Sequence, residues 1–181
     1  MSKNNITVLG IHYFIHDAGD ALVQNGKVLA SINEEKIRNI KHCGGYPTKS
    51  IGEVFKIAKL DPSEVDAVAI VGILGEKILP ISEMFPNYRS LFSYFSLLTG
   101  HKKGIELLTS YLQRIKKIDA IKNKLTKLGI PLNEIIFVEH HAAHAAAAYY
   151  LSPWDLDEEV MILTLDGQGD GISATVNIGH K

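Results

Sequence analysis

The segment from His140 to His144 holds a dense group of side chains that can bind metal. It reads His-His-Ala-Ala-His and contains three of the eight histidines of the chain. The alanines around it favour a helix, and residues four apart on a helix lie on one face, with Cβ atoms about 5–6 Å apart. His140 and His144 are therefore predicted to bind one metal ion together, as paired helical histidines do elsewhere.

His141 is rotated from His140 by about 100° around such a helix. It is predicted to contact a substrate, as a catalytic side chain, and not the metal. The alternative for the whole segment is a helix that displays surface histidines and binds nothing.

A second group of polar residues is Asp166-Gly167-Gln168-Gly169-Asp170-Gly171. It resembles the start of a calcium-binding EF-hand loop, but Gln168 stands at the third position, Asn177 stands where a glutamate is needed, and the flanks have strand character. We predict a tight hairpin turn whose glycine backbone N–H groups cradle a phosphate.

Asp166 ends the strand before this turn, where it can complete a site of two histidines and one carboxylate. Such a ligand set suits Fe(II), with Zn(II) or Mn(II) as competitors. The alternative is a hairpin turn that is merely rich in glycine and aspartate.

Two further clusters lie near the N-terminus. Residues 16–20, His-Asp-Ala-Gly-Asp, form a predicted turn that faces the glycine-rich turn across a cleft between two lobes, although plain turn chemistry explains it as well. The expected cofactor contacts of the two turns are Asp17, Gly167, Gly169 and Asp170. Residues 34–47 carry alternating charges and are predicted to form a solvated loop, with Cys43 as a bystander.

Composition narrows the class of protein. The 181 residues are 46% hydrophobic and 22% charged, with a net charge of −1. This profile is that of an ordinary globular protein, and it argues against nucleic acid and anionic membranes as partners. The single cysteine excludes an intrachain disulfide and fits the cytoplasm, where we expect the protein to be.

The elements that must position these residues follow from periodicity. Asn25-Gly26 between two apolar runs predicts a hairpin. The remaining expected elements are strands at 6–12, 21–24, 27–32, 65–71, 135–138, 160–165 and 172–178, helices at 50–60 and 140–150, and a helical insertion at 76–128.

Three antiparallel strands followed by helix, strand, helix and strand is the order of a ribonuclease-H-like lobe. The predicted fold class is α/β, with a mixed five-stranded sheet in residues 1–155. Two such lobes make the actin, sugar-kinase and Hsp70 type of fold, and residues 156–181 are expected to be the first hairpin of an incomplete second lobe.

Taken together, these clusters resemble the N-terminal part of the O-carbamoyltransferases that act in nodulation and antibiotic tailoring. The resemblance spans nearly the whole chain and is weakest at 76–128. The motifs that carry it are Leu9-Gly10-Ile11, His16-Asp17-Ala18, Ala21-Leu22-Val23, Asn25-Gly26-Lys27, Glu34-Glu35, Arg38, Lys41-His42, Gly44-Gly45-Tyr46-Pro47, His140 to Ala146 and Asp166 to Gly171. Cys43 departs from the family, which commonly has an acidic residue there.

The resemblance implies a function and a set of roles. A C-terminal domain would make carbamoyl adenylate from carbamoyl phosphate and ATP, and the N-terminal domain would pass the carbamoyl group, near an iron ion, to a hydroxyl of a sugar, antibiotic or other small molecule. His140, His144 and Asp166 would be metal ligands, with a fourth, an aspartate, beyond residue 181. His16 would be a base, and Lys41 would contact a phosphate or carbonyl.

Two other functions fit the fold. A sugar kinase would need a site for ATP and Mg²⁺ and would have no use for paired helical histidines. A non-catalytic or regulatory binding module would keep the fold without the chemistry. We expect the reading frame to continue past Lys181, so that this chain is part of a longer enzyme. The acceptor and the oligomeric state, for which a homodimer is one option, stay open.

Overall fold

The computed structural model describes residues 5–13, 16–71, 115–155 and 157–180. The chain divides into two compact units, Met1–Glu76 with Thr126–Lys181, and Lys77–Leu125. Most of the predicted insertion, residues 76–128, lies outside the described residues. Of its described part, residues 115–127 are helical, with Ile118, Ile121 and Leu125 buried, as the predicted helical spacing requires.

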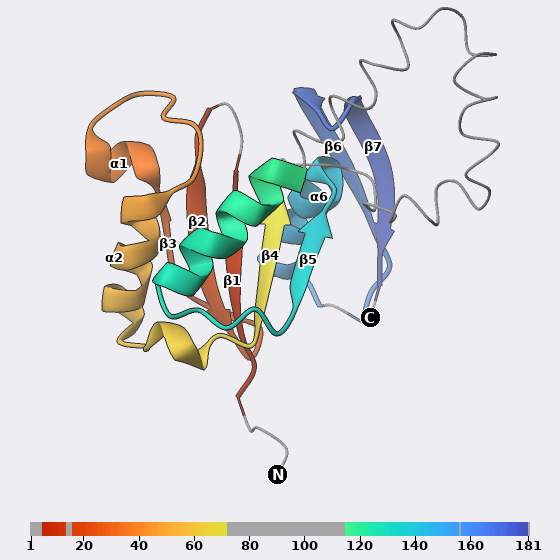
Figure 1. Ribbon diagram of the computed structural model, residues 1–181. Helices are drawn as coiled ribbons and strands as arrows, with labels where there is room; N and C mark the ends of the chain where they lie inside the picture. The colour runs from red at the N-terminus through yellow and green to blue at the C-terminus, as the bar shows by residue number, and fades with distance from the viewer. Residues whose placement is uncertain (1–4, 14–15, 72–114, 156, 181) are drawn as a thin grey trace, which may run out of the picture. The chain divides into compact units, whose positions relative to one another are not determined.

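A mixed five-stranded sheet forms the centre of the first unit, as predicted (Figure 1). Its order is β3-β2-β1-β4-β5; β1 pairs antiparallel with β2 and parallel with β4, and β5 is parallel to β4. This is the strand order of a ribonuclease-H-like lobe. The strands are β1 (Thr7–His12), β2 (Gly19–Gln24), β3 (Lys27–Asn33), β4 (Ala67–Val71) and β5 (Ile135–Val138).

Local sequence explains the sheet. Asn25 and Gly26 have φ angles of 51° and 77°, which is the left-handed geometry of a two-residue hairpin turn. Leu9, Ile11 and Leu22 are at most 1% exposed, because alternate residues of a strand point to the same face and that face is covered.

Helix α2 (Thr48–Ala58) covers β2 and β3 through an apolar stripe of Ile51, Val54 and Phe55. It ends at Lys59 in a left-handed conformation, and the short helix η1 (Pro62–Glu64), capped by Asp61, leads into β4. The predicted helix, 50–60, is thus confirmed with bounds shifted by two residues.

The predicted solvated loop at 34–47 is wrong in its first part. Helix α1 (Glu34–Arg38) begins there, and Glu34 is only 2% exposed. Its carboxylate accepts the backbone N–H groups of Lys49 and Ser50, at 2.9 and 2.8 Å. The first N–H groups of a helix have no partner within the helix, and Glu34 serves α2 in this way from a distant part of the chain.

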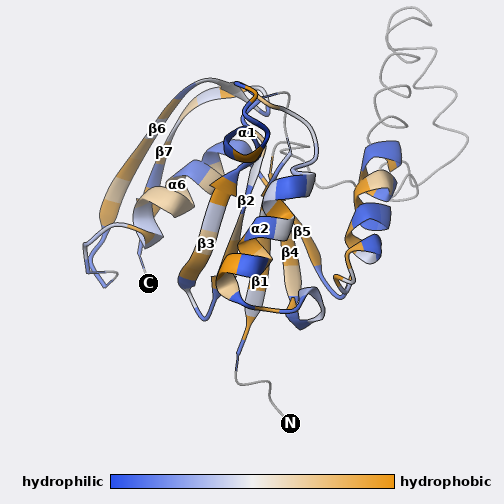
Figure 2. Ribbon diagram, turned by 90° about the vertical axis from the view of Figure 1, so that its left-hand side faces the viewer, coloured by the Kyte–Doolittle hydropathy of each residue, from blue (hydrophilic) through white to orange (hydrophobic). Residues whose placement is uncertain are grey.

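A two-stranded hairpin follows helix α6 (His140–Tyr150) and consists of β6 (Val160–Gly169) and β7 (Ile172–Gly179). Its inner face packs on α6 through Ile162, Ala145 and Tyr149. Its outer face is apolar and exposed, and Figure 2 shows this hydrophobic colouring along β6. The exposed side chains are Met161, Leu163, Leu165, Val176 and Ile178. That the hairpin begins a second lobe stays a prediction.

The predicted turn at 166–171 is shorter than expected. β6 continues to Gly169, with an irregular register after Leu165, and the turn consists of Asp170 and Gly171, whose φ angles are 50° and 82°. Two adjacent residues with positive φ suffice for a hairpin turn, so the preceding glycines stay in the strand. Among the described residues, no helix combines the length and the apolar character needed to cross a membrane.

Asp20, a buried residue of β2, accepts a hydrogen bond from the Ser50 hydroxyl. Burial raises its pKa to about 7, Glu34 adds to the rise and the Ser50 hydrogen bond opposes it. Between these two pKa values, 3.8 in the unfolded chain and about 7 in the folded chain, Asp20 is protonated when the chain is folded and ionised when it is unfolded. Between about pH 4 and pH 7 this group makes the free energy of unfolding fall as the pH rises.

Asp20→Asn should remove this dependence. We expect the variant to gain stability relative to the wild type as the pH rises from about 4 to 8, measured by urea unfolding at several pH values. Glu158→Gln, which changes an exposed carboxyl group, is the control and should follow the wild type. A difference between Asp20→Asn and the wild type that is constant with pH would contradict the buried, protonated Asp20.

Candidate metal centre

The first turn of α6 is held in place by carboxylates at its N-terminus. Glu139, the residue before the helix, accepts the N–H groups of His141 and Ala142 at 2.9 and 2.7 Å. Asp170 of the hairpin turn accepts the N–H group of His140 at 2.9 Å. Negative groups at a helix N-terminus satisfy its N–H groups and its dipole. Because β5 ends at Val138, the first histidine lies at the carboxyl edge of the parallel strands.

The structure brings together the three predicted ligands, His140, His144 and Asp166. Nε2 of His140 lies 2.7 Å from Oδ2 of Asp166 and 3.0 Å from Nε2 of His144. Nε2 of His144 lies 3.4 Å from the same carboxylate oxygen. Two ligands on neighbouring positions of one ion, each about 2.1 Å from it, are separated by roughly 3.0–3.4 Å. The two distances of His144 lie in this range, whereas the 2.7 Å between His140 and Asp166 is that of a hydrogen bond and would lengthen slightly around an ion.

The hydrogen count of this group also fits a cation. A carboxylate only accepts hydrogen bonds, so the short contact to Asp166 needs a hydrogen on Nε2 of His140. That nitrogen then has no lone pair to offer His144, which lies 3.0 Å away. Each of the three atoms has a lone pair when it carries no hydrogen. A metal ion in place of the hydrogen on His140 would take a lone pair from each.

Burial and charge differ across the group. His140 is 7% exposed, whereas the side chains of Asp166 and His144 are 37% and 55% exposed. The hydrogen bond with His140 holds the pKa of Asp166 below its usual value, and the N–H group of Gly167 lowers it further. Asp166 is therefore a carboxylate at neutral pH, which is the form that binds metal.

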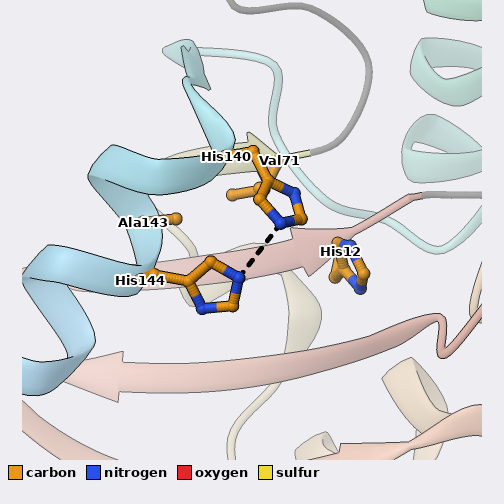
Figure 3. Close-up of a pocket in the computed structure, with 5 residues that line it drawn as sticks. All are labelled: His12, Val71, His140, Ala143 and His144. Atoms are coloured by element: carbon orange, nitrogen blue, oxygen red, sulfur yellow. Dashed lines mark hydrogen bonds between the residues drawn. The ribbon is translucent and has the colours of Figure 1, made fainter. Parts of the chain in front are cut away.

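A cavity of about 200 Å³ opens beside the two ligand histidines. Figure 3 shows His140 and His144 facing each other on α6, with His12 across from them. Its lining residues are His12, Val71, His140, Ala143 and His144. Ala143 adds little bulk, so a bound group can approach both imidazoles of the helix.

His12 belongs to none of the predicted site clusters. It is the last residue of β1, and its Nδ1 donates a hydrogen bond to the Asp17 carbonyl at 3.1 Å. Burial lowers the pKa of His12, and the charges of His140, His16 and His144 lower it further, against the effect of the Asp17 carbonyl. Its position at the carboxyl end of a central strand is the signal that could have identified it.

His141 lies outside the cavity. It is fully buried, with Nδ1 2.7 Å from the Thr164 hydroxyl and Nε2 2.9 Å from the Ile172 carbonyl. Both ring nitrogens are bonded to protein atoms, so a direct contact with substrate, as predicted, has no support in this geometry. The rotation of about 100° from His140 around the helix turns the His141 ring toward Thr164 and Ile172.

His16 and Asp17 form a second imidazole and carboxylate group. Nδ1 of His16 lies 2.9 Å from Oδ2 of Asp17, and Nδ1 of His42 lies 3.3 Å from Oδ1. The hydrogen bond with His16 is the largest cause of the lowered pKa of Asp17. His42 is a second residue that the sequence analysis left without a role, and Lys41 beside it is exposed.

The segment from Asp166 to Gly171 makes contacts within the protein, apart from the predicted contact with a phosphate. Gly167 donates its N–H to Asp166 at 2.6 Å, and Asp170 bonds to the start of α6. A Cβ at Gly169 would overlap the His140 ring, so only glycine fits there. A phosphate contact from Gly167, Gly169 or Asp170 stays a prediction.

Comparison with known proteins shows the family to which the chain belongs. The sequence profile of the family described as "Carbamoyltransferase N-terminus" matches residues 7–181. An uncharacterized protein of Synechocystis, sll1178, is 31% identical over 96% of this chain and 27% of its own length. Nodulation protein NolNO of Sinorhizobium fredii is 30% identical over 92% of this chain and 22% of its own length. The chain thus spans about a quarter of the length of these relatives.

Among solved structures, YeaZ from Pseudomonas aeruginosa matches with a TM-score of 0.42 and 15% sequence identity. The match covers 96% of this chain and 66% of that chain.

The geometry predicts one divalent transition metal ion per chain. Replacing His140, His144 or Asp166 with alanine removes one of three ligands, so each variant should bind Zn(II) at least about tenfold more weakly. Competition titration against a coloured chelator measures this. His180→Ala, which removes an exposed histidine outside the group, should bind as the wild type does. Equal affinities for all variants would show that the group is not a metal site.

Proposed function

The chain belongs to the carbamoyltransferase N-terminus family, and from this premise we propose that it transfers a carbamoyl group to a hydroxyl of a small molecule at the centre formed by His140, His144 and Asp166. The observation that carries the proposal is the convergence of these three ligand atoms beside a cavity. A family of carbamoyl-transferring proteins and an open site for a Lewis acid point to the same chemistry.

The donor set favours Fe(II), with Zn(II) or Mn(II) as competitors, because imidazole and carboxylate together suit these ions. When bound, the ion would act as a Lewis acid that polarises a carbonyl oxygen. The residues of this chain supply the rest of the site. His140 and Asp166 hold each other in place at 2.7 Å, and the exposed His144 completes the group on the solvent side.

His16 is the proposed base for the acceptor hydroxyl. Asp17 accepts the hydrogen on Nδ1 of His16, so the neutral ring has its lone pair on Nε2. A carboxylate that orients an imidazole in this way is the arrangement by which enzymes take a proton from a hydroxyl. Lys41, which precedes His42 in the sequence and is exposed, is the proposed contact for a phosphate or a carbonyl of the donor.

The proposed donor is carbamoyl adenylate, made from carbamoyl phosphate and ATP by a C-terminal domain of the longer protein. In the transfer, the acceptor oxygen forms a bond to the carbamoyl carbon, the bond from that carbon to the adenylate oxygen breaks, and the acceptor proton goes to the base. AMP leaves with the electron pair. His12 faces this reaction from the end of β1 as part of the cavity wall.

The sugar-kinase alternative is disfavoured by the convergence of two imidazoles, since ATP-bound Mg²⁺ prefers oxygen ligands. The alternative of a non-catalytic or regulatory module predicts that the ligand group binds metal weakly or that its loss leaves the activity of the longer protein intact. The variants below decide between them.

In a longer protein that contains this chain and the adenylate-forming domain, His140→Ala and His144→Ala should lower carbamoyl transfer by at least about 100-fold, because they remove ligands of the Lewis acid. Release of pyrophosphate from ATP and carbamoyl phosphate should be unchanged, since adenylate formation uses none of these side chains. Both products are measured in the same reaction. Transfer that persists in both variants would favour a non-catalytic role for this centre.

His16→Ala should lower the transfer rate by about 100-fold or more, as loss of a general base does, without loss of bound metal. Metal analysis and initial rates of the same preparation provide the two values.

Lys41→Ala should raise the KM for the donor, because it removes the proposed contact to a phosphate or a carbonyl. Lys36→Ala, which removes another exposed lysine from the same segment, is the matched control and should leave this KM unchanged.

We also expect the 181-residue chain by itself to lack carbamoyl transfer from ATP and carbamoyl phosphate, because the proposed adenylate-forming domain lies outside it. Incubation with both substrates and a set of sugar alcohols, followed by mass spectrometry, tests this. Carbamoylated product above background would overturn the proposed division of labour.

A further inference from the structure

The buried ring of His141 connects α6 to both strands of the hairpin. Its Nδ1 lies 2.7 Å from the hydroxyl of Thr164 in β6, and its Nε2 lies 2.9 Å from the carbonyl of Ile172 in β7. A carbonyl only accepts, so Nε2 carries the hydrogen and, in the neutral ring, Nδ1 accepts the Thr164 hydroxyl. The carbonyl of Ile172 therefore determines the direction of both bonds of the neutral ring.

A relay of hydrogen bonds supports this ring from behind. With the Thr164 hydroxyl donated to His141, its oxygen accepts from the Thr175 hydroxyl at 2.6 Å and from the Thr175 N–H at 3.2 Å. The side-chain amide of Asn177 donates to the Thr175 hydroxyl at 2.8 Å. Every bond in the relay has one donor and one acceptor, so the relay is fully satisfied and rigid.

The hairpin needs such a device because it lies outside the five-stranded sheet. Within the described part of the chain, β6 and β7 form a sheet of their own that packs on α6. At one end of α6 the packing is apolar, through Ala145, Tyr149 and Ile162. Apolar contact is not directional, so by itself it allows the hairpin to slide or tilt on the helix.

The His141 relay is at the other end, next to the metal ligands. Thr164 stands two residues before Asp166, and Ile172 two residues after Asp170, which bonds to the N–H group of His140. A shift of β6 on α6 would move Oδ2 of Asp166 relative to the two imidazoles, which lie 2.7 and 3.4 Å from it. The hydrogen bonds of His141 thus hold the hairpin close to Asp166, the third proposed ligand.

We propose that His141 is a positioning residue that holds the β6–β7 hairpin against α6 and thereby sets Asp166 opposite His140 and His144. This inference rests on the proposed metal centre. The proposal predicts that the affinity for metal depends on Thr164 and His141, although neither side chain binds the ion.

The test compares three variants of strand β6 in this chain. Thr164→Val keeps the shape and removes the hydroxyl, Thr164→Ser keeps the hydroxyl, and Ile162→Val deletes one methylene at the apolar end of the same face. Zn(II) affinity is measured by chelator competition at a temperature where thermal unfolding shows that all variants are folded. Thr164→Val should bind about 10–100-fold more weakly, as when an outer partner of a metal ligand is lost. Thr164→Ser and Ile162→Val should stay within about threefold of the wild type.

A purely structural role would lower the melting temperature of Thr164→Val and leave its metal affinity like that of Ile162→Val, and that result would overturn the proposal. If Thr164→Val does not fold, a second measurement still tests the proposal. Histidine ¹⁵N spectra of the wild type should show His141 with its hydrogen on Nε2 and none on Nδ1, and any other state would contradict the relay.

Failure of the metal centre itself would be recognised separately. In that case His140→Ala and Asp166→Ala would bind Zn(II) as the wild type does. If those two variants lose affinity and Thr164→Val keeps it, the metal centre stands and the positioning role of His141 is wrong.

Discussion

The fit of two adjacent buried histidines to one hairpin is the constraint on which this site depends. His140 and His141 are 7% and 0% exposed, and buried imidazoles need hydrogen-bond partners. Three of their ring partners, Asp166, Thr164 and Ile172, are on β6 and β7. Helix α6 is poor in large apolar side chains because most of its residues are alanine. Polar, directional bonds therefore determine how the hairpin sits on α6, and the same bonds bring the carboxylate of Asp166 to His140 and His144, the proposed metal ligands.

Two imidazole and carboxylate groups with different surroundings divide the chemistry of the proposed reaction. In the first, Asp166 joins two histidines that converge on one point, which suits a cation. In the second, Asp17 binds His16 and His42 through different oxygens in an exposed position, which suits transfer of a proton with solvent or substrate. Similar residues thus acquire different tasks from the elements that carry them. His12, bonded to the Asp17 carbonyl and lining the cavity beside His140, links the two groups.

Local sequence rules predict the parts of this fold that short-range physics decides. Ile135–Val138 and His140–Tyr150 have the predicted bounds, because periodicity and alanine content act within the segment itself. The pairing of His140 with His144 follows from helix geometry in the same way. Asp166 joined them as predicted because the end of a strand is a position that sequence can locate.

The features that sequence did not predict depend on partners far along the chain. Glu34 reads as part of a charged loop, but two N–H groups some 15 residues away make its burial favourable. The sequence predicts that His141 contacts a substrate, but the register of β6 and β7 supplies partners for both its ring nitrogens. Gly169 reads as a turn residue, but the His140 ring requires the absence of a Cβ there. In each case the deciding neighbour is tertiary, so no local pattern carries the signal.

The group of His140, His144 and Asp166 can exchange a hydrogen bond for a metal ion without moving the hairpin. Without an ion, one hydrogen on Nε2 of His140 serves the carboxylate of Asp166, while His144 stands 3.0 Å from the same nitrogen. A cation bound by these three atoms would take the place of that hydrogen, and the neutral imidazole of His140 would then carry its hydrogen on Nδ1. The relay through His141 does not take part in this exchange, because its ring nitrogens bond to Thr164 and Ile172. The ligand atoms can thus change partner while the hairpin that carries Asp166 stays where it is.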